Sequence, residues 1–428
     1  MRVEELESNQ CPTEEQLGRN IGMNQEIMEK VSKIISDVRQ NGDEALFRYT
    51  QEFDGVKLNS LRVLDIDIQK AMRQVPRHVQ DALTLAAKNI KDFHEHQVQQ
   101  SWFVTRPDGA LLGSRVSPLA CVGIYVPGGR ASYPSTVLMN AIPAQVAGVP
   151  RIVMVTPPGH NGAVDPALLV AAQLAGVTDI YTVGGAQAIA ALAYGSDQIP
   201  AVDKITGPGN SYVAAAKRLV FGDVGIDMVA GPSEVLILAD ETADPSLVAI
   251  DLLAQAEHDP QANTYLVTTD EDLVDEVIEK IELYLAASPR QEITKESIDK
   301  HNVVFVCPDL NTAIRAVNTI APEHLEIQMD QPHELLGLIE NAGAVFLGPW
   351  TPESVGDYVS GANHTLPTGG TARFSSPLSV DDFIKKTNII SYSYAALQKE
   401  APAIASLAGV EGLWAHGRAV ELRFENED

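Results

Sequence analysis

Strand-like and helix-like segments alternate along most of this sequence, and glycine or proline follows each strand-like segment. Apolar, β-branched runs occur at 120–126, 152–156 and 180–183. An Ala-Gln-x-Ala-Gly-Val pattern at 144–149 returns at 172–177, and a strand-like run follows each copy. The distance between the two copies is the length of one helix plus one strand. The repeat therefore predicts successive βα units, which build a parallel sheet.

The alternation resumes after Gly231-Pro232 and predicts a second sheet. Its strand-like runs, separated by helical patterns, are 235–239, 264–268, 303–306, 325–328 and 344–347. Residues 24–41 have the apolar periodicity of a helix that Gly42 would end. The chain from 380 onward reads as mostly helical with a final strand at 419–424. We therefore expect an α/β protein with two Rossmann-like parallel-sheet domains and helical N-terminal and C-terminal segments.

Composition excludes several classes of protein. The formal charge of −26 argues against a nucleic-acid-binding surface, which requires a basic face. No apolar stretch approaches the roughly 18 residues of a membrane span, and residues 1–20 lack the apolar core of a secretory signal. The cysteines, Cys11, Cys121 and Cys307, are too few and too widely spaced for a disulfide framework or a CxxC metal site. We expect a cytoplasmic protein.

Two glycine-containing turns between a strand and a helix are candidate phosphate sites. They are Val183-Gly184-Gly185-Ala186-Gln187 and Thr206-Gly207-Pro208-Gly209-Asn210. Glycine allows close backbone approach, and a helix N-terminus favours an anion. Neither turn is GxGxxG, and both sequences suit plain tight turns equally well.

Candidate metal ligands are scattered along the second half of the chain. Gln255 and His258 share one face of a helix, and Asp357, His364 and His416 lie in or near glycine-rich loops. Two imidazoles, a carboxylate and an amide oxygen would form a closed set of nitrogen and oxygen ligands for zinc. Taken singly, each histidine is better explained as an ordinary loop or surface residue.

Glu323 and His324 are adjacent and follow Pro322, which keeps both on a loop. Neighbouring titratable groups can divide two proton-transfer roles, so the pair is a candidate acid–base couple. A charge pair at the end of a helix would have the same sequence. Cys121 and Cys307 lie in or at the end of apolar runs, where cysteine behaves as a small hydrophobe rather than a nucleophile.

Taken in order, several longer motifs resemble the histidinol dehydrogenase family from end to end. They are Gly123–Gly129, Gly184–Ala191, Gly207–Asn210, Ala230–Glu234, Gln255–His258, Pro322–Leu325, Ser354–Thr368 and Ala415-His416. Residues 371–376 resemble the version of the family found in Gram-positive bacteria.

The resemblance implies an activity and a set of site residues. L-histidinol would be oxidised through bound L-histidinal to L-histidine by two NAD, the last two steps of histidine biosynthesis. His324 would be the base, and Glu323 would activate water for the aldehyde. One zinc ion per subunit would be held by Gln255, His258, Asp357 and His416. Those four, His324, Ser233 and Glu411 would bind substrate. Tyr125, Gln187 and Asn210 would contact NAD.

The resemblance also implies a homodimer in which the C-terminal segment crosses to the partner, so that Glu411 and His416 complete the other subunit's site. The expected domains are an N-terminal arm at 1–20, a large α/β domain at 21–100 and 232–370 carrying the metal and acid–base residues, an NAD-binding domain at 101–231 and the crossing segment at 371–428.

Three alternatives remain. Paralogues of the family oxidise other small alcohols, including sulfonated ones, although the presence of both Glu323 and Glu411 favours histidinol. An inactive binding protein would not need an acid–base couple. A zinc hydrolase would keep an open water position on its metal, unlike a set of four protein ligands.

Overall fold

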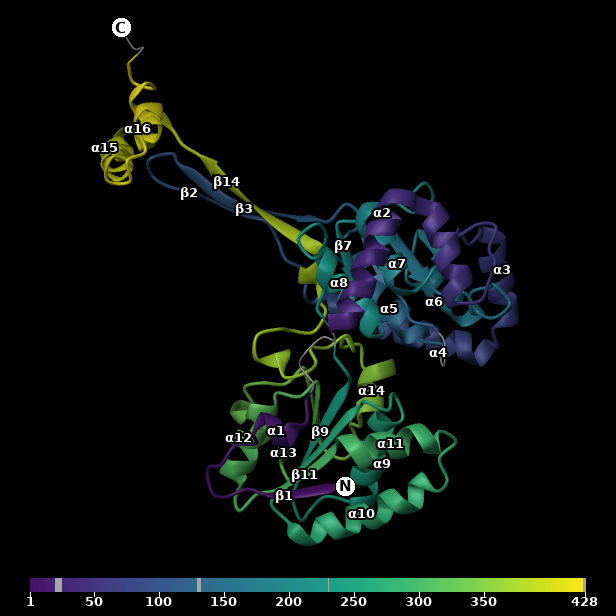
Figure 1. The fold of residues 1–428 in the computed structure, drawn as a ribbon. Coiled ribbons are helices and arrows are strands. Elements are labelled where there is room, and N and C mark those ends of the chain that lie inside the picture. The colour runs from purple at the N-terminus through teal and green to yellow at the C-terminus, as the bar shows by residue number, and fades with distance from the viewer. Residues whose placement is uncertain (20–24, 129–131, 230, 426–428) are drawn as a thin grey trace. The chain divides into compact units, whose positions relative to one another are not determined.

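The computed structural model of this chain forms two compact units (Figure 1). It describes residues 1–19, 25–128, 132–229 and 231–425. The first unit comprises Met1–Gln97 and Leu119–Phe383, and the second comprises Val98–Pro118 and Ile384–Asp428. Both parallel sheets lie in the first unit, which confirms the predicted α/β class. Among the described residues, no helix is both long and apolar enough to cross a lipid bilayer.

A five-stranded parallel sheet forms one half of the first unit. Its spatial order is β6 (Asp179–Thr182), β5 (Ile152–Thr156), β4 (Val122–Tyr125), β7 (Lys204–Thr206) and β8 (Gly225–Ile226). Successive side chains of a strand point to opposite faces. Ile152 and Met154 therefore pack into one core, while Val153 and Val155 pack into another.

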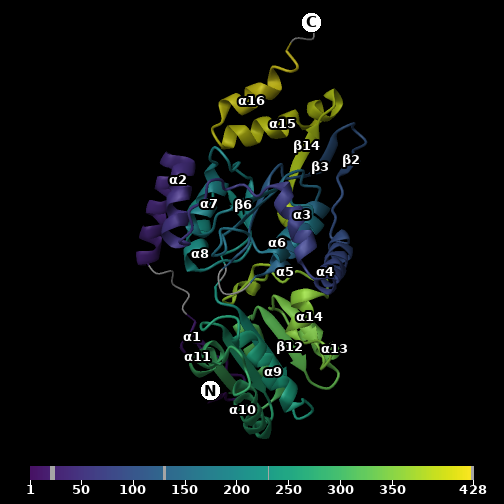
Figure 2. The same cartoon turned by 90° about the vertical axis from the view of Figure 1, so that its right-hand side faces the viewer.

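Helices cover both faces of this sheet (Figure 2). The helices between its strands are α5 (Pro134–Val146), α6 (Pro166–Leu174), α7 (Gly185–Tyr194) and α8 (Ser211–Val220). The preceding helices are α2 (Gln25–Phe53), α3 (Asp65–Gln74) and α4 (Arg77–Glu95). The α2 helix packs on α7 and α8, whereas α3 packs on α6 and α4 packs on α5. Gly42, at φ +49°, interrupts α2 at the predicted position.

This packing differs from the expected domain boundary, which grouped 21–100 with 232–370. The apolar faces of α2, α3 and α4 instead complete the two cores of the five-stranded sheet. A helix pattern in sequence shows that a face will be buried, but it does not identify the sheet that buries it.

A six-stranded parallel sheet forms the other half of the first unit. Its order is β1 (Arg2–Glu5), β11 (Asn302–Val306), β10 (Asn263–Thr268), β9 (Glu234–Ala239), β12 (His324–Gln328) and β13 (Ala344–Leu347). The predicted N-terminal arm thus supplies an edge strand. The helices of this half are α1 (Glu14–Leu17), α9 (Pro245–Ala256), α10 (Glu271–Leu285), α11 (Gln291–His301), α12 (Leu310–Ile320), α13 (Pro332–Leu335) and α14 (Glu353–Tyr358).

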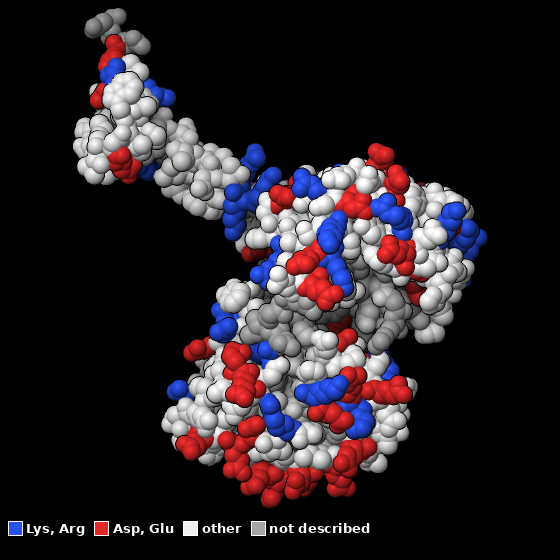
Figure 3. All heavy atoms as spheres, viewed as in Figure 1, with Lys and Arg blue, Asp and Glu red and all other residues white. Residues whose placement is uncertain are grey.

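Acidic side chains gather on the end of this half that carries α10 (Figure 3). The acids of α10 are at 271, 272, 275, 276, 279 and 282. In the view shown, basic side chains are interspersed with acidic ones.

The second unit contains an antiparallel sheet and two helices. The strand order is β14 (Ile384–Ser391), β3 (Leu111–Pro118) and β2 (Trp102–Thr105), followed in the chain by α15 (Tyr394–Val410) and α16 (Trp414–Glu421). The strand predicted at 419–424 is wrong, because α16 occupies most of it and packs on α15. The C-terminal segment also pairs with residues 111–118, which the sequence assigned to the NAD-binding domain.

Candidate active site and metal centre

Glu323 and His324 lie where α12 ends and β12 begins. Ala321 ends α12 in a left-handed conformation with φ +48°, and Pro322 follows it. In the sheet His324 is flanked by Val235 of β9 and by the first residue of β13. Ligand sites of parallel sheets usually lie at the carboxyl ends of the strands. Glu323 and His324 instead lie at the amino end of β12.

The backbone of β9 orients the His324 ring. Its Nδ1 lies 3.0 Å from the carbonyl oxygen of Glu234. Because a carbonyl oxygen only accepts hydrogen bonds, Nδ1 carries the proton and Nε2 keeps its lone pair. Burial lowers the pKa of His324 to about 4, an effect that the carboxylate of Asp357 opposes. At neutral pH the ring is therefore a neutral imidazole that can accept a proton.

The same residue of β9 also holds Glu323. The backbone N–H of Glu234 donates to Oε2 of Glu323 at 2.9 Å, and the Ser233 hydroxyl forms a further hydrogen bond with this carboxyl group. Burial raises the pKa of Glu323 well above its usual value, and the nearby carboxylates of Glu234 and Asp357 add to the increase. The predicted substrate residue Ser233 thus lies directly beside the predicted acid–base pair.

Glu234 is itself fixed by a buried ion pair. The Arg19 guanidinium donates from Nε and Nη2 to the two carboxylate oxygens at 2.9 and 3.0 Å. The backbone N–H of Gly369 donates to the same carboxylate at 3.2 Å. A charge-assisted, two-point contact of this kind restricts the start of β9 strongly, and with it the peptide that orients Glu323 and His324.

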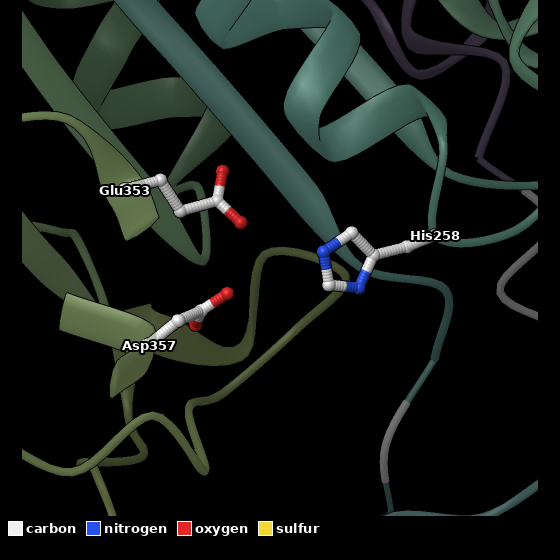
Figure 4. A group of neighbouring side chains, drawn as sticks. All are labelled: His258, Glu353 and Asp357. Carbon is white, nitrogen blue, oxygen red and sulfur yellow. The ribbon is translucent and has the colours of Figure 1, made fainter. Parts of the chain in front are cut away.

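Three side chains form a cluster that could hold a cation (Figure 4). His258 follows α9, and Glu353 and Asp357 lie one turn apart on α14. One ligand atom from each side chain lies within 4.8 Å of those from the other two. The structure thus brings together two predicted ligands, His258 and Asp357, and adds Glu353, which the sequence analysis missed. Its i, i+4 spacing from Asp357 is the signal that would have identified it.

Gln255 completes the predicted ligands of the first unit. It lies on α9, three residues before His258, and is fully buried. Among the described residues, neither polar atom of its side chain has a hydrogen-bond partner. An unpaired buried amide is costly, and a metal ion would satisfy its oxygen. Because α9 and α14 both end near the cluster, the negative ends of their dipoles also favour a cation.

His364 lies against this cluster and beside a cavity. Its Nδ1 lies 3.1 Å from the backbone oxygen of Asp357. The cavity has a volume of about 170 Å³, and its lining includes His324, Phe346, Val355 and His364. It offers an apolar space for a small organic group next to the neutral imidazole of His324.

Glu411 and His416 lie in the second unit. Glu411 caps the C-terminal end of α15, and His416 is on α16. Both side chains are exposed. Because the two units are described separately, a meeting of these residues with the cluster remains a prediction.

The predicted NAD residues lie where strands of the five-stranded sheet end. Tyr125 is the last residue of β4, and its hydroxyl accepts the backbone N–H of Gly185 at 3.1 Å. Burial raises the pKa of Tyr125 to about 12, so its hydroxyl stays protonated. Gln187 is buried on α7, and its Oε1 has no partner among the described residues. Asn210 caps α8 by accepting the backbone N–H groups of residues 212 and 213.

The glycines of the two turns allow each turn to approach the end of a neighbouring strand closely. A Cβ on Gly207, at φ +111°, would lie 2.1 Å from the backbone oxygen of Tyr125. A Cβ on Gly184 would lie 2.6 Å from Cβ of Pro157, which follows β5. The amino ends of α7 and α8 therefore share one edge of the sheet, where backbone N–H groups can meet an anion.

Comparison with known proteins shows which family this chain is similar to. A family model described as histidinol dehydrogenase matches residues 18–424. The histidinol dehydrogenase of Halalkalibacterium halodurans is 54% identical over 93% of this chain and 94% of its own. That of Bacillus subtilis is 53% identical over 92% of each chain. A crystal structure of histidinol dehydrogenase from Elizabethkingia anophelis, at 38% identity, superposes with a TM-score of 0.92 over 99% of this chain and 98% of that chain.

Proposed function

From the premise that this chain belongs to the histidinol dehydrogenase family and is an NAD-dependent oxidoreductase, we propose that it oxidises L-histidinol to L-histidine through bound L-histidinal. The observation that carries this proposal is the buried, neutral His324 beside Glu323, next to the His258, Glu353 and Asp357 cluster. This arrangement supplies a base, a second carboxyl group and a cation site within one region of the first unit.

In the first oxidation, the substrate's hydroxyl proton moves to Nε2 of His324 while its carbon loses a hydride. NAD, when bound, would be the hydride acceptor, and Tyr125, Gln187 and Asn210 would contact it. Removal of the proton in step with the hydride avoids a high-energy protonated carbonyl, which is the contribution of a general base. The hydrogen bond from Nδ1 to Glu234 stabilises the imidazolium that forms.

The second oxidation requires water, because an aldehyde has no hydroxyl proton to release. The ionised form of Glu323 takes a proton from water as the oxygen adds to the carbonyl carbon. A carboxyl group whose pKa is raised by burial is a stronger base when ionised than an exposed one. The protonated His324 returns its proton to the carbonyl oxygen, which completes the gem-diol and leaves the ring neutral. The gem-diol then gives a proton to His324 while its carbon loses a second hydride, for which a second NAD would be the acceptor, and the carboxylic acid remains.

Gln255, His258, Asp357 and His416 would hold zinc, and Glu353 lies in contact range of the same site. Zinc, when bound, would attach the substrate's imidazole and amine nitrogens and so fix its reacting carbon. Ser233 and Glu411 would bind the remaining polar groups of the substrate. We further propose a cytoplasmic homodimer in which Glu411 and His416 complete the partner's site.

The test is the number of NADH molecules formed per L-histidinol consumed, with and without prior chelation. Two NADH, lost on chelation and restored by zinc, would support the four-electron reaction and the metal. Glu323→Gln should give one NADH and release the aldehyde, because hydration fails. Absence of NADH formation by the zinc-loaded protein would contradict the proposal and favour a paralogue that oxidises another small alcohol, such as a sulfonated one.

A further inference from the structure

One face of β12 is polar although the strand is fully buried. His324, Glu326 and Gln328 alternate with Leu325 and Ile327, so the three polar side chains share a face. Leu325 and Ile327 pack into the apolar core on the other face. The proposed mechanism uses only the first of the three polar residues, and the burial of the other two requires a separate explanation.

Gln328 connects β12 to α9. Its Nε2 donates to Oδ2 of Asp251 on α9 and to Oε2 of Glu326 on its own strand, both at 2.9 Å. Asp251 lies one helical turn before Gln255 on the same face of α9. A contact that fixes Asp251 therefore also fixes the turn that carries Gln255 and leads to His258.

Glu326 connects β12 to α14 in the same way. Its Oε1 accepts the backbone N–H of Glu353, the first residue of α14, at 2.8 Å. Asp357 lies one turn further along α14. Each of the two helices thus has an anchor on β12 and, one turn later, a residue of the proposed metal site.

We propose that Asp251, Glu326 and Gln328 form a positioning network that sets the separation of the metal-ligating turns of α9 and α14 beside His324. This inference rests on the proposed function, because it concerns the geometry of that same site. None of the three side chains touches the reacting atoms in this account. They act through Gln255, His258 and Asp357.

The chemistry of the network supports a positioning role. Asp251 and Glu326 are hydrogen-bonded to each other, so two carboxyl groups share a proton. Burial raises the pKa of both groups, and the Asp251 carboxylate raises the pKa of Glu326 further. Apolar side chains would fill this space at a lower energetic cost than a buried polar network. Polar groups there have directional hydrogen bonds, which fix the relative placement of helices more tightly than apolar packing does.

The experiment uses the zinc-loaded full-length protein and Gln328→Met, which keeps the side-chain length and removes both hydrogen bonds. We expect zinc to be lost to the chromophoric chelator 4-(2-pyridylazo)resorcinol about 10- to 100-fold faster, the usual effect of removing a partner of metal ligands. We expect kcat for histidinol to fall while KM for NAD stays unchanged, because the five-stranded sheet is untouched.

Ile327→Val is the matched control. It removes apolar packing from the other face of the same strand and leaves the network intact. The rate of zinc loss should therefore stay at the wild-type value, although Tm should decrease about as much as in Gln328→Met. Glu326→Gln should retain most of the wild-type behaviour. Its amide oxygen can still accept from Glu353 and its NH₂ can donate to Asp251, so only the bond that Glu326 accepts from Gln328 is lost. If Gln328→Met does not fold, Asp251→Ala replaces it, because Asp251 is only partly buried on a helix.

Equal zinc loss from Gln328→Met and Ile327→Val would overturn the inference, as would wild-type zinc retention in Gln328→Met or Asp251→Ala. A wild-type protein that holds zinc but does not oxidise histidinol would overturn the proposed function alone, and the zinc measurements would still decide the role of the network. A wild-type protein that binds no zinc would overturn both.

Discussion

The two parallel sheets of the first unit use opposite ends of their strands. In the five-stranded sheet, Tyr125 is the last residue of β4, and the other candidate NAD residues, Gln187 and Asn210, lie at the amino ends of α7 and α8. In the six-stranded sheet, the candidate acid–base pair lies at the amino end of β12, where α9 and α14 terminate. Helix amino ends favour anions and helix carboxyl ends favour cations. The difference matches a dinucleotide phosphate in one half and a metal ion in the other.

We expect the largest difference between the two halves from His324→Gln, which should lower kcat without changing the affinity for NAD. The variant keeps a polar side chain of similar size but has no base, so kcat should fall by about 10²- to 10⁴-fold. The affinity for NAD, measured by quenching of intrinsic fluorescence, should not change, because His324 does not belong to the five-stranded sheet. Activity within tenfold of wild type would contradict the assignment of proton transfer to the six-stranded sheet.

The pH dependence of the free energy of unfolding should also reflect the burial of His324 in the six-stranded half. The folded-state pKa of His324 is about 4, below the usual 6.5, so the unfolded chain binds more protons between these values. The contribution of His324 to the free energy of unfolding is therefore at its full value above about pH 6.5. It decreases as pH falls toward 4, by about 3 kcal/mol at most. Urea unfolding of metal-free protein should show this loss in wild type but not in His324→Gln. Identical pH profiles for the two proteins would rule it out.

Asn210→Asp should give a smaller effect in the five-stranded sheet. Aspartate can cap α8 as asparagine does, and its charge suits the helix amino end, so Tm should stay equal or rise slightly. The same charge would repel a phosphate there and raise KM for NAD about tenfold, which corresponds to about 1.4 kcal/mol. Asn210→Ser, which caps without a charge, is the control. An unchanged KM for NAD in Asn210→Asp would place the phosphate elsewhere.

The sequence predicts most strands of the first unit well because they form short runs of mainly apolar residues between helical patterns. The runs predicted at 152–156 and 344–347 coincide with β5 and β13. The strands of the second unit were missed, because β2 and β14 are largely exposed and lack an apolar run on a buried face. Domain membership of 25–95 was also misassigned, since periodicity marks a buried face and not its partner.

For the site, the sequence predicted Glu323, His324, His258 and Asp357, and the structure places all four in one region. It missed Glu353, which reads as an ordinary acid in the first turn of a short helix. It also missed Glu326 and Gln328, because polar residues within a strand give no indication of which helices they contact. Spacing in the sequence predicts which residues share a face of one helix or strand. Contacts between different helices and strands depend on the tertiary structure.

The edge strand β1 has a consequence for synthesis of the chain. Arg2 pairs with Val303, so β1 leaves the ribosome well before β11, its partner in the sheet, has been synthesised. The five-stranded sheet, by contrast, takes all its strands from 122–226 and can close while β11 is still untranslated. Pairings distant in sequence form slowly, and nascent domains fold as units. The half with the five-stranded sheet should therefore be assembled first, and the half with the candidate acid–base pair should be completed only late in translation.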